Sequence, residues 1–211
     1  MSEGLGAYVV GLFLALVQVL GGITPTPTHT PQPVVDPPRF PVVGAVSFGA
    51  THHDYPATDI FAACGSPVVA PVDGVVLEVG RRDRWDPLVN AGATRGGRFV
   101  SIEGTDGVRY YGSHLRSVRR DLRRGTVVRA GDRLGRVGRS GDARPVGCHL
   151  HFGLSPLCGT GQGDDWWIRR GVVSPYRFLV GWQRGAARSP ARAVRLWQRA
   201  HGCPTAPLTD P

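Results

Sequence analysis

Short apolar runs separated by glycine dominate the chain between about residues 42 and 155. They read PVVAPVDGVVLEVG, GRFVSIEG, GVRYYGSHL, GTVVRAGDRLGRVG and CHLHFGLS. Within these runs Val, Ile, Tyr and Phe alternate with polar residues, and turn residues recur roughly every 8–15 positions, which is the pattern of short antiparallel strands. We therefore predict an all-β fold of antiparallel sheets.

A different pattern precedes this region. The run from Leu5 to Leu20 is apolar and almost uncharged, and its length suits a secretory signal or a short membrane anchor. A buried helix would need a surrounding domain, but a Thr/Pro tract follows directly. We predict that residues 1–22 are a signal peptide or membrane anchor, so that the protein is secreted or membrane-anchored in the cell envelope. No clear A-x-A site follows, so cleavage of the segment, or its contact with the membrane, stays open.

Proline sets the character of the next segment. Residues 24–41 read TPTPTHTPQPVVDPPRFP, and proline excludes helix and interior strand because it fixes φ and lacks a backbone N–H. We predict a semi-rigid Pro/Thr-rich linker at residues 23–43. A β-rich domain at 44–160 and a small C-terminal extension at 161–211 follow it.

The extension is rich in aromatic residues and arginine. Its tryptophans either form a glycan-stacking surface or pack the extension on the β core, and we favour packing for Trp166, Trp167 and Trp182. The sequence SPARAVRLWQRAH predicts a short helix near 190–201. Ser189 is placed to cap it and Pro190 to occupy its first position.

Composition limits the class of protein. The chain has 211 residues, of which 41% are hydrophobic and 19% charged, as expected of a globular protein with one domain of ordinary size. All 25 basic residues are arginine, and the net charge is +9. This charge attracts polyanions such as nucleic acid, acidic wall polymers or anionic lipid. The arginines are scattered among turns without a recognition element, so we expect no nucleic acid partner, and we expect a monomer.

Five of the seven histidines fall at three places in the β-rich region. His149 and His151 are one residue apart in HLHFG, so on a strand they share one face, opposite Leu150 and Phe152. Taken alone, this pair also fits two surface histidines on a half-exposed strand. The other places carry His52 and His53 with Asp54 and Asp59, and His114. Imidazoles and a carboxylate are the ligands of catalytic zinc, which takes three from the protein and leaves one position open.

The order of these motifs resembles the lysostaphin/LytM-like zinc endopeptidases of bacterial cell walls. The matching stretches are HHDYPATDIFAACGSPVVAPVDGVV, YYGSHLRSV, VVRAGDRLGRVGRSG and CHLHFGLS. They cover approximately residues 44–156. The resemblance implies a zinc metallopeptidase domain at 44–160, with antiparallel sheets that form an open groove and one Zn²⁺ per chain.

Individual roles follow from the resemblance, position by position. Asp59 and His151 match the family's metal ligands, and His114 and His149 match its two non-ligand catalytic imidazoles. Such imidazoles act as general base or stabilise a developing oxyanion.

The first metal ligand departs from the family pattern. The family usually has H-x-x-x-D, but Tyr55 stands four residues before Asp59. A loop longer by two residues still allows a histidine to reach the metal. We favour His53 over His52 as this ligand and place Asp54 in the loop.

The four cysteines are consistent with disulfides in an exported protein. No C-x₂₋₄-C pair is present, and three pairings are possible for Cys64, Cys148, Cys158 and Cys203. An extended segment at 149–155 separates Cys148 from Cys158 beyond bridging distance unless the chain doubles back. We favour Cys64 with Cys148, because both flank segments of the expected site, which leaves Cys158 with Cys203.

The resemblance implies a function for the whole. It implies a zinc metalloendopeptidase, a peptidoglycan hydrolase that cuts stem peptides or cross-bridges, with peptidoglycan as the substrate. The alternative is a catalytically inactive relative that binds the cell wall or regulates other wall hydrolases. The unusual first-ligand spacing favours this alternative, whereas the presence of Asp59, His114, His149 and His151 argues against it. The motifs do not identify which bond is cut.

Overall fold

The computed structural model of the chain describes residue 1, residues 36–158 and residues 165–204. The apolar segment at 1–22, apart from Met1, and most of the Pro/Thr-rich linker lie outside the described residues. Among the residues that are described, no helix has the length and apolar character needed to cross a membrane.

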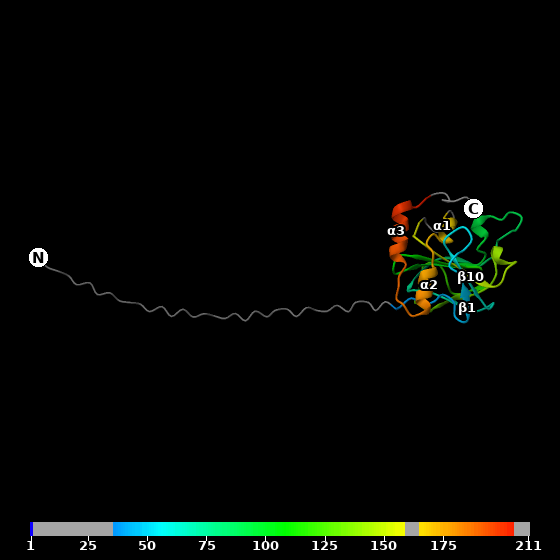
Figure 1. Cartoon of the computed structure of the whole chain (residues 1–211), viewed down its shortest axis with the longest axis horizontal. Helices are drawn as coiled ribbons and strands as arrows, with labels where there is room; N and C mark the ends of the chain where they lie inside the picture. Colours follow the sequence, from blue (N-terminus) through cyan, green and yellow to red (C-terminus); the bar gives the residue numbers. More distant parts are fainter. Residues whose placement is uncertain (2–35, 159–164, 205–211) are drawn as a thin grey trace. The chain divides into compact units, whose positions relative to one another are not determined.

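In the part of the chain that the structure describes, two antiparallel sheets form the β-rich body, which confirms the predicted fold class. Figure 1 shows this body with the helices beside it. The larger sheet has the order β1-β2-β10-β6-β5-β4-β8. Its strands are β1 (Val46–Phe48), β2 (Thr58–Ala62), β4 (Gly74–Gly80), β5 (Phe99–Gly104), β6 (Arg109–Ser113), β8 (Val127–Val128) and β10 (His149–Ser155). The smaller sheet has the order β3-β9-β7 and consists of β3 (Pro67–Val69), β9 (Arg133–Arg136) and β7 (Ser117–Val118).

The last strand, β10, lies between β2 and β6 in the larger sheet. Its register pairs His151 with Asp59 of β2 and with Ser113 of β6. Residues directly opposite on antiparallel strands have neighbouring side chains on the same face. The pairing therefore brings together two predicted site residues that are 92 positions apart in the chain.

The alternation along β10 separates the site from the core. Leu150 and Phe152 are buried in the main hydrophobic cluster, while His149 and His151 lie on the opposite face, as predicted. Val68 and Leu134 of the smaller sheet belong to the same cluster. The apolar side of the HLHFG strand therefore stabilises the domain, and its polar side is available for chemistry.

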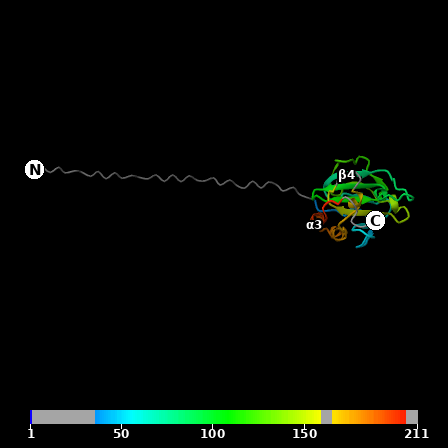
Figure 2. The same cartoon turned by 90° about the horizontal axis from the view of Figure 1, so that it is seen from above.

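Within residues 165–204, three helices follow β10. They are α1 (Trp166–Arg169), α2 (Tyr176–Gln183) and α3 (Ala191–His201), and α2 and α3 lie side by side at one edge of the β-rich body (Figures 1 and 2). Buried side chains of α2 and α3 join the main cluster, namely Phe178, Leu179, Trp182 and Val194. The predicted helix is α3, which begins at Ala191, and Ser189 Oγ accepts a hydrogen bond from the Ala191 N–H at 3.0 Å as expected of a cap. The sequence did not predict α1 and α2.

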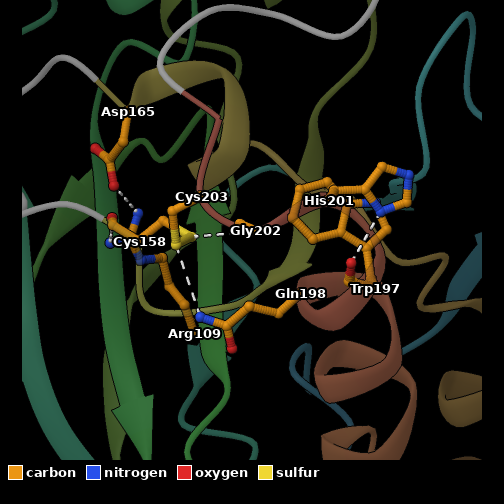
Figure 3. The surroundings of a disulfide bond; sticks show 8 residues. All are labelled: Arg109, Cys158, Asp165, Trp197, Gln198, His201, Gly202 and Cys203. Atoms are coloured by element: carbon orange, nitrogen blue, oxygen red, sulfur yellow. Dashed lines mark hydrogen bonds and ion pairs between the residues drawn. A yellow bond between two sulfur atoms is a disulfide. The ribbon is translucent and has the colours of Figure 1, made fainter.

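Two disulfides are present, Cys64–Cys148 and Cys158–Cys203, with Cα atoms 5.3 and 5.4 Å apart. The favoured pairing is thus confirmed. Figure 3 shows the second bond beside Arg109, whose guanidinium donates to Asp165 at 2.6 Å and to the Cys158 carbonyl at 3.1 Å. These contacts tie the start of α1 to β6.

Candidate active site

A cavity of about 520 Å³ opens on the polar face of the larger sheet. Its wall contains every histidine and the aspartate that the sequence singled out: His52, His53, Asp59, His114, His149 and His151. The structure therefore brings all predicted site residues to one place. Asp54 also lines the cavity, but it is exposed and belongs to the loop before β2.

Asp59 lies at the centre of the histidines. Its Oδ1 is 3.1 Å from His151 Nδ1 and 3.4 Å from His52 Nε2. Its Oδ2 is 3.9 Å from His149 Nε2. One carboxylate is thus within reach of two nitrogens from β10 and one from the loop before β2.

Backbone contacts decide which nitrogen of His151 is available. Its Nε2 lies 2.8 Å from the carbonyl oxygen of Arg170. Because a carbonyl only accepts hydrogen bonds, Nε2 carries the proton and Nδ1 keeps its lone pair. That lone pair faces Asp59. A ligand histidine whose second nitrogen donates to a carbonyl is the usual arrangement at protein metal sites.

His149 and His114 have the opposite tautomer. Nδ1 of His149 lies 2.9 Å from the Gly147 carbonyl, and Nδ1 of His114 lies 2.8 Å from the Ser140 carbonyl. In both rings Nδ1 therefore donates and Nε2 keeps its lone pair. The two rings are 4.9 Å apart between centroids. The two histidines of HLHFG thus differ in the nitrogen that they offer.

The backbone at His114 is strained. Its φ of +62° lies in the left-handed region, which non-glycine residues seldom adopt. The segment that holds its ring depends on Gly141, where φ is +72° and a Cβ atom would lie 1.9 Å from the Arg95 carbonyl oxygen. Close backbone approach at Gly141 places the Ser140 carbonyl beside His114.

Burial controls the protonation of the site. It lowers the pKa of His114 to about 3, helped by the neighbouring His151 and His149, and the pKa of His52 to about 4, helped by His151. Both rings are therefore neutral at neutral pH. Burial would raise the pKa of Asp59, but the nearby imidazoles of His151, His52 and His149 hold that pKa below its usual range. Asp59 is thus a carboxylate surrounded by imidazole nitrogens.

The donor set matches the needs of zinc. Two ligands at about 2.0–2.1 Å from a tetrahedral zinc ion lie ~3.3 Å from each other. The distances from Asp59 Oδ1 to His151 Nδ1 and to His52 Nε2, 3.1 and 3.4 Å, have this size. The residues present therefore fit a zinc ion.

The histidine pair in the loop offers two candidates for the remaining ligand. His52, His53 and Asp59 each place one ligand atom within 4.8 Å of the others. His52 is half-buried, and its ring centroid is 4.8 Å from that of His151, whereas His53 is exposed. His53 has a φ of +22°, so the loop turns sharply between the two rings.

Sequence reasoning missed one residue of the site. The Arg170 carbonyl comes from the C-terminal extension, 19 residues after the histidine that it holds. Every residue supplies a backbone carbonyl, so no side-chain motif marks this contact. A Cβ on Gly153 would lie 2.1 Å from that oxygen, and this glycine in HLHFG is the available signal.

Comparison with known sequences gives the following. The sequence model of peptidase family M23 matches residues 53–162. The L-Ala–D-Glu endopeptidase of Bacillus subtilis is 30% identical over 132 residues, which are 60% of this chain and 35% of that protein. The chain thus spans about a third of the length of this curated relative.

One solved structure supports the fold, and a second is similar over part of the chain. A crystal structure from Ruminococcus gnavus, of a protein described as a glycyl-glycine endopeptidase LytM, has a TM-score of 0.54 and 26% identity over 73% of this chain and 63% of that one. The catalytic domain of lysostaphin from Staphylococcus simulans, described as an antimicrobial peptidase, has a TM-score of 0.47 and 23% identity over 64% of this chain and 92% of that one.

Proposed function

Because the chain belongs to peptidase family M23, we propose that it is a zinc-dependent endopeptidase that hydrolyses peptide bonds in peptidoglycan stem peptides or cross-bridges. One observation carries the proposal. Asp59 places one oxygen 3.1 and 3.4 Å from nitrogens of His151 and His52, the separation of zinc ligands, and two further imidazoles share the same cavity.

Asp59 and His151 are two of the proposed zinc ligands, and the pair His52–His53 supplies the third. The shorter contacts and greater burial of His52 support that residue. The family match begins at residue 53, which supports His53, the ligand favoured by sequence. His52→Ala and His53→Ala separate them: we expect zinc content per chain to fall in one variant and to stay near one in the other.

His114 and His149 are the proposed catalytic residues. Each holds a proton on Nδ1 against a backbone carbonyl and has a free lone pair on Nε2. The free nitrogen accepts a proton from the attacking water, or, once protonated, donates to the oxyanion that forms on the substrate carbonyl and to the leaving amine. A bound zinc ion supplies positive charge that polarises the carbonyl and acidifies water.

The identity of the scissile bond is proposed by analogy with the Bacillus subtilis relative. That protein is named for the L-Ala–D-Glu bond, and we propose the same bond as the first to test. The extracytoplasmic location predicted from residues 1–22 agrees with a wall substrate. The basic charge of the chain, +9, favours adsorption to acidic wall polymers.

The test is digestion of purified peptidoglycan, with mass analysis of the new peptide termini. We expect new termini with the zinc-loaded chain, none after treatment with chelator, and none with His151→Ala. A chain that binds zinc in the cavity without releasing termini from any wall preparation contradicts the proposal. That result supports the alternative, a non-catalytic relative that binds the wall or regulates other hydrolases.

A further inference from the structure

Among the described residues, three arginines line the cavity, and their guanidinium groups differ in their partners. Arg169 forms an ion pair with Glu78, and Arg95 donates from Nε to Asn90. The Nε atoms of Arg169 and Arg170 are both buried without a partner, but for Arg170 none of the described residues supplies a carboxylate or a hydrogen-bond acceptor to the terminal nitrogens either. A buried, unsatisfied charged donor is costly unless a ligand satisfies it.

Arg170 is held in place by stacking. Its guanidinium carbon lies 3.8 Å from the centroid of the Tyr55 ring and 5.2 Å from that of Trp166. Stacking uses the face of a guanidinium and leaves its N–H groups free to donate in its plane. The Tyr55 ring centroid is 5.8 Å from that of His151. The Tyr55 ring therefore lies near both the guanidinium of Arg170 and the ring of His151, a proposed zinc ligand.

The backbone of the same residue is fixed to the site. The Arg170 carbonyl accepts the hydrogen bond from His151, and its oxygen approaches Gly153 so closely that no Cβ fits there. The backbone from which the guanidinium extends is therefore fixed in position. An arginine with both ends fixed is preorganised to bind one ligand group in one orientation.

We propose that Arg170 binds a free carboxylate of the peptide substrate, next to the scissile bond, through the two terminal nitrogens of its guanidinium. Planar guanidinium and planar carboxylate match in a bidentate pair, which the stacked geometry leaves open. This inference rests on the proposed function, since it names the kind of peptide that the same cavity accepts. Peptides with a glutamate carboxylate beside the bond are bound well, and the corresponding carboxamides are bound poorly.

The experiment uses two acetylated, C-terminally amidated tetrapeptides that differ in one group. One is centred on the L-Ala–D-Glu bond, and the other has D-Gln in place of D-Glu. Binding constants are measured on the full chain treated with chelator, so that a carboxylate cannot bind zinc, and kcat/KM is measured on the zinc-loaded chain. Bonds to a charged partner contribute about 1.5–3 kcal/mol, so we expect the carboxylate peptide to bind about 10–100-fold more tightly.

Variants assign this preference to the side chain. In Arg170→Gln the two peptides should bind equally, and in Arg170→Lys, which keeps the charge but not the planar fork, the preference should be reduced. Arg192→Gln removes the same charge from the exposed face of α3 and should behave as the unaltered chain. Neither Arg170 variant removes the backbone carbonyl that holds His151, and thermal unfolding checks that each is folded.

The outcomes separate this inference from the proposed function. Equal binding of the two peptides by the unaltered chain overturns the inference without reference to any variant, and so does a preference that persists in Arg170→Gln. Hydrolysis with no carboxylate preference leaves the proposed function standing and the inference wrong. If the preference depends on Arg170 but neither peptide is hydrolysed, the inference stands and the proposed function is contradicted.

Discussion

Three imidazoles of the cavity are each held by a backbone carbonyl, and the choice of nitrogen differs among them. His114 and His149 donate from Nδ1, whereas His151 donates from Nε2 to Arg170. The free lone pair therefore lies on Nε2 in two rings and on Nδ1 in the third. Neighbouring histidines on one face of a strand acquire different chemistry because different segments of backbone contact them.

Substitution of these residues should separate metal binding from catalysis. We expect His114→Ala and His149→Ala to keep about one zinc per chain and to lose activity by roughly 10²–10⁴-fold, the usual contribution of an acid–base group. Asp59→Ala and His151→Ala should lose zinc as well. Zinc analysis and hydrolysis rates on the same samples check this, and loss of zinc in His149→Ala would make that residue a ligand.

The contact between Gly153 and Arg170 gives a second prediction. A methyl group on Gly153 meets the Arg170 oxygen at 2.1 Å, so Gly153→Ala should displace the carbonyl that orients His151. Loss of such a contact typically costs about 10–100-fold in metal affinity. Competition with a chromophoric chelator measures it. Gly49→Ala, whose new methyl would have ordinary 3.9 Å contact, should leave the affinity unchanged.

At the scale of single residues, most of the side chains that line the candidate site were predicted from the sequence. The alternation in HLHFG predicted that His149 and His151 share a face, and the motifs predicted that Asp59 and His114 join them in the cavity. The choice between His52 and His53 was not predictable, because it depends on the turn of an unusually long loop. The role of Arg170 depends on a backbone contact from another element, which no residue pattern encodes.

Among the elements, β10 matters most for the candidate site, because it carries both His149 and His151. It lies between β2 and β6, and the disulfide Cys64–Cys148 links the segment after β2 to the residue before β10. The bond closes a loop with a sequence separation of 84. A crosslink of this kind restricts the unfolded chain and stabilises both strands that carry site residues.

Removal of that bond tests its contribution. We expect the double variant Cys64→Ser, Cys148→Ser to lose about 2–5 kcal/mol of unfolding free energy. Urea denaturation measures the loss, with reduction of the unaltered chain as a check. A variant as stable as the unaltered chain would show that pairing in the sheet alone fixes the register.

Element prediction succeeded where periodicity was clear. Alternating apolar residues predicted the strands, and Ser189 with Pro190 marked the start of α3. The helices α1 and α2 were missed because their aromatic-rich sequence has no clear helical period and α1 has only four residues. Their packing is decided by the core that they cover rather than by local propensity.

At the scale of the whole molecule, zinc binding and folding should be linked. The proposed ligands come from the loop before β2, from β2 and from β10, and they converge only in the folded chain. A ligand that binds only the folded state stabilises it by about 2.7 kcal/mol at 100 times its Kd. We expect Tm to rise with added zinc in the unaltered chain, and to be independent of zinc in Asp59→Ala.

The large-scale organisation was predicted unevenly from the sequence. The all-β class followed from periodicity and glycine punctuation, but the division into a seven-stranded and a three-stranded sheet did not, because strand order depends on long-range pairing. The signal or anchor at 1–22 stays a prediction that lies, apart from Met1, outside the described residues.

Hydrolysis of purified peptidoglycan, followed by mass analysis before zinc removal, after it, and after zinc is restored, is the decisive measurement. Cleavage that disappears with chelator and returns with one zinc per chain is the predicted result. Cleavage that is unaffected by complete removal of the metal would contradict the convergence of Asp59, His151 and a loop histidine on a catalytic zinc ion.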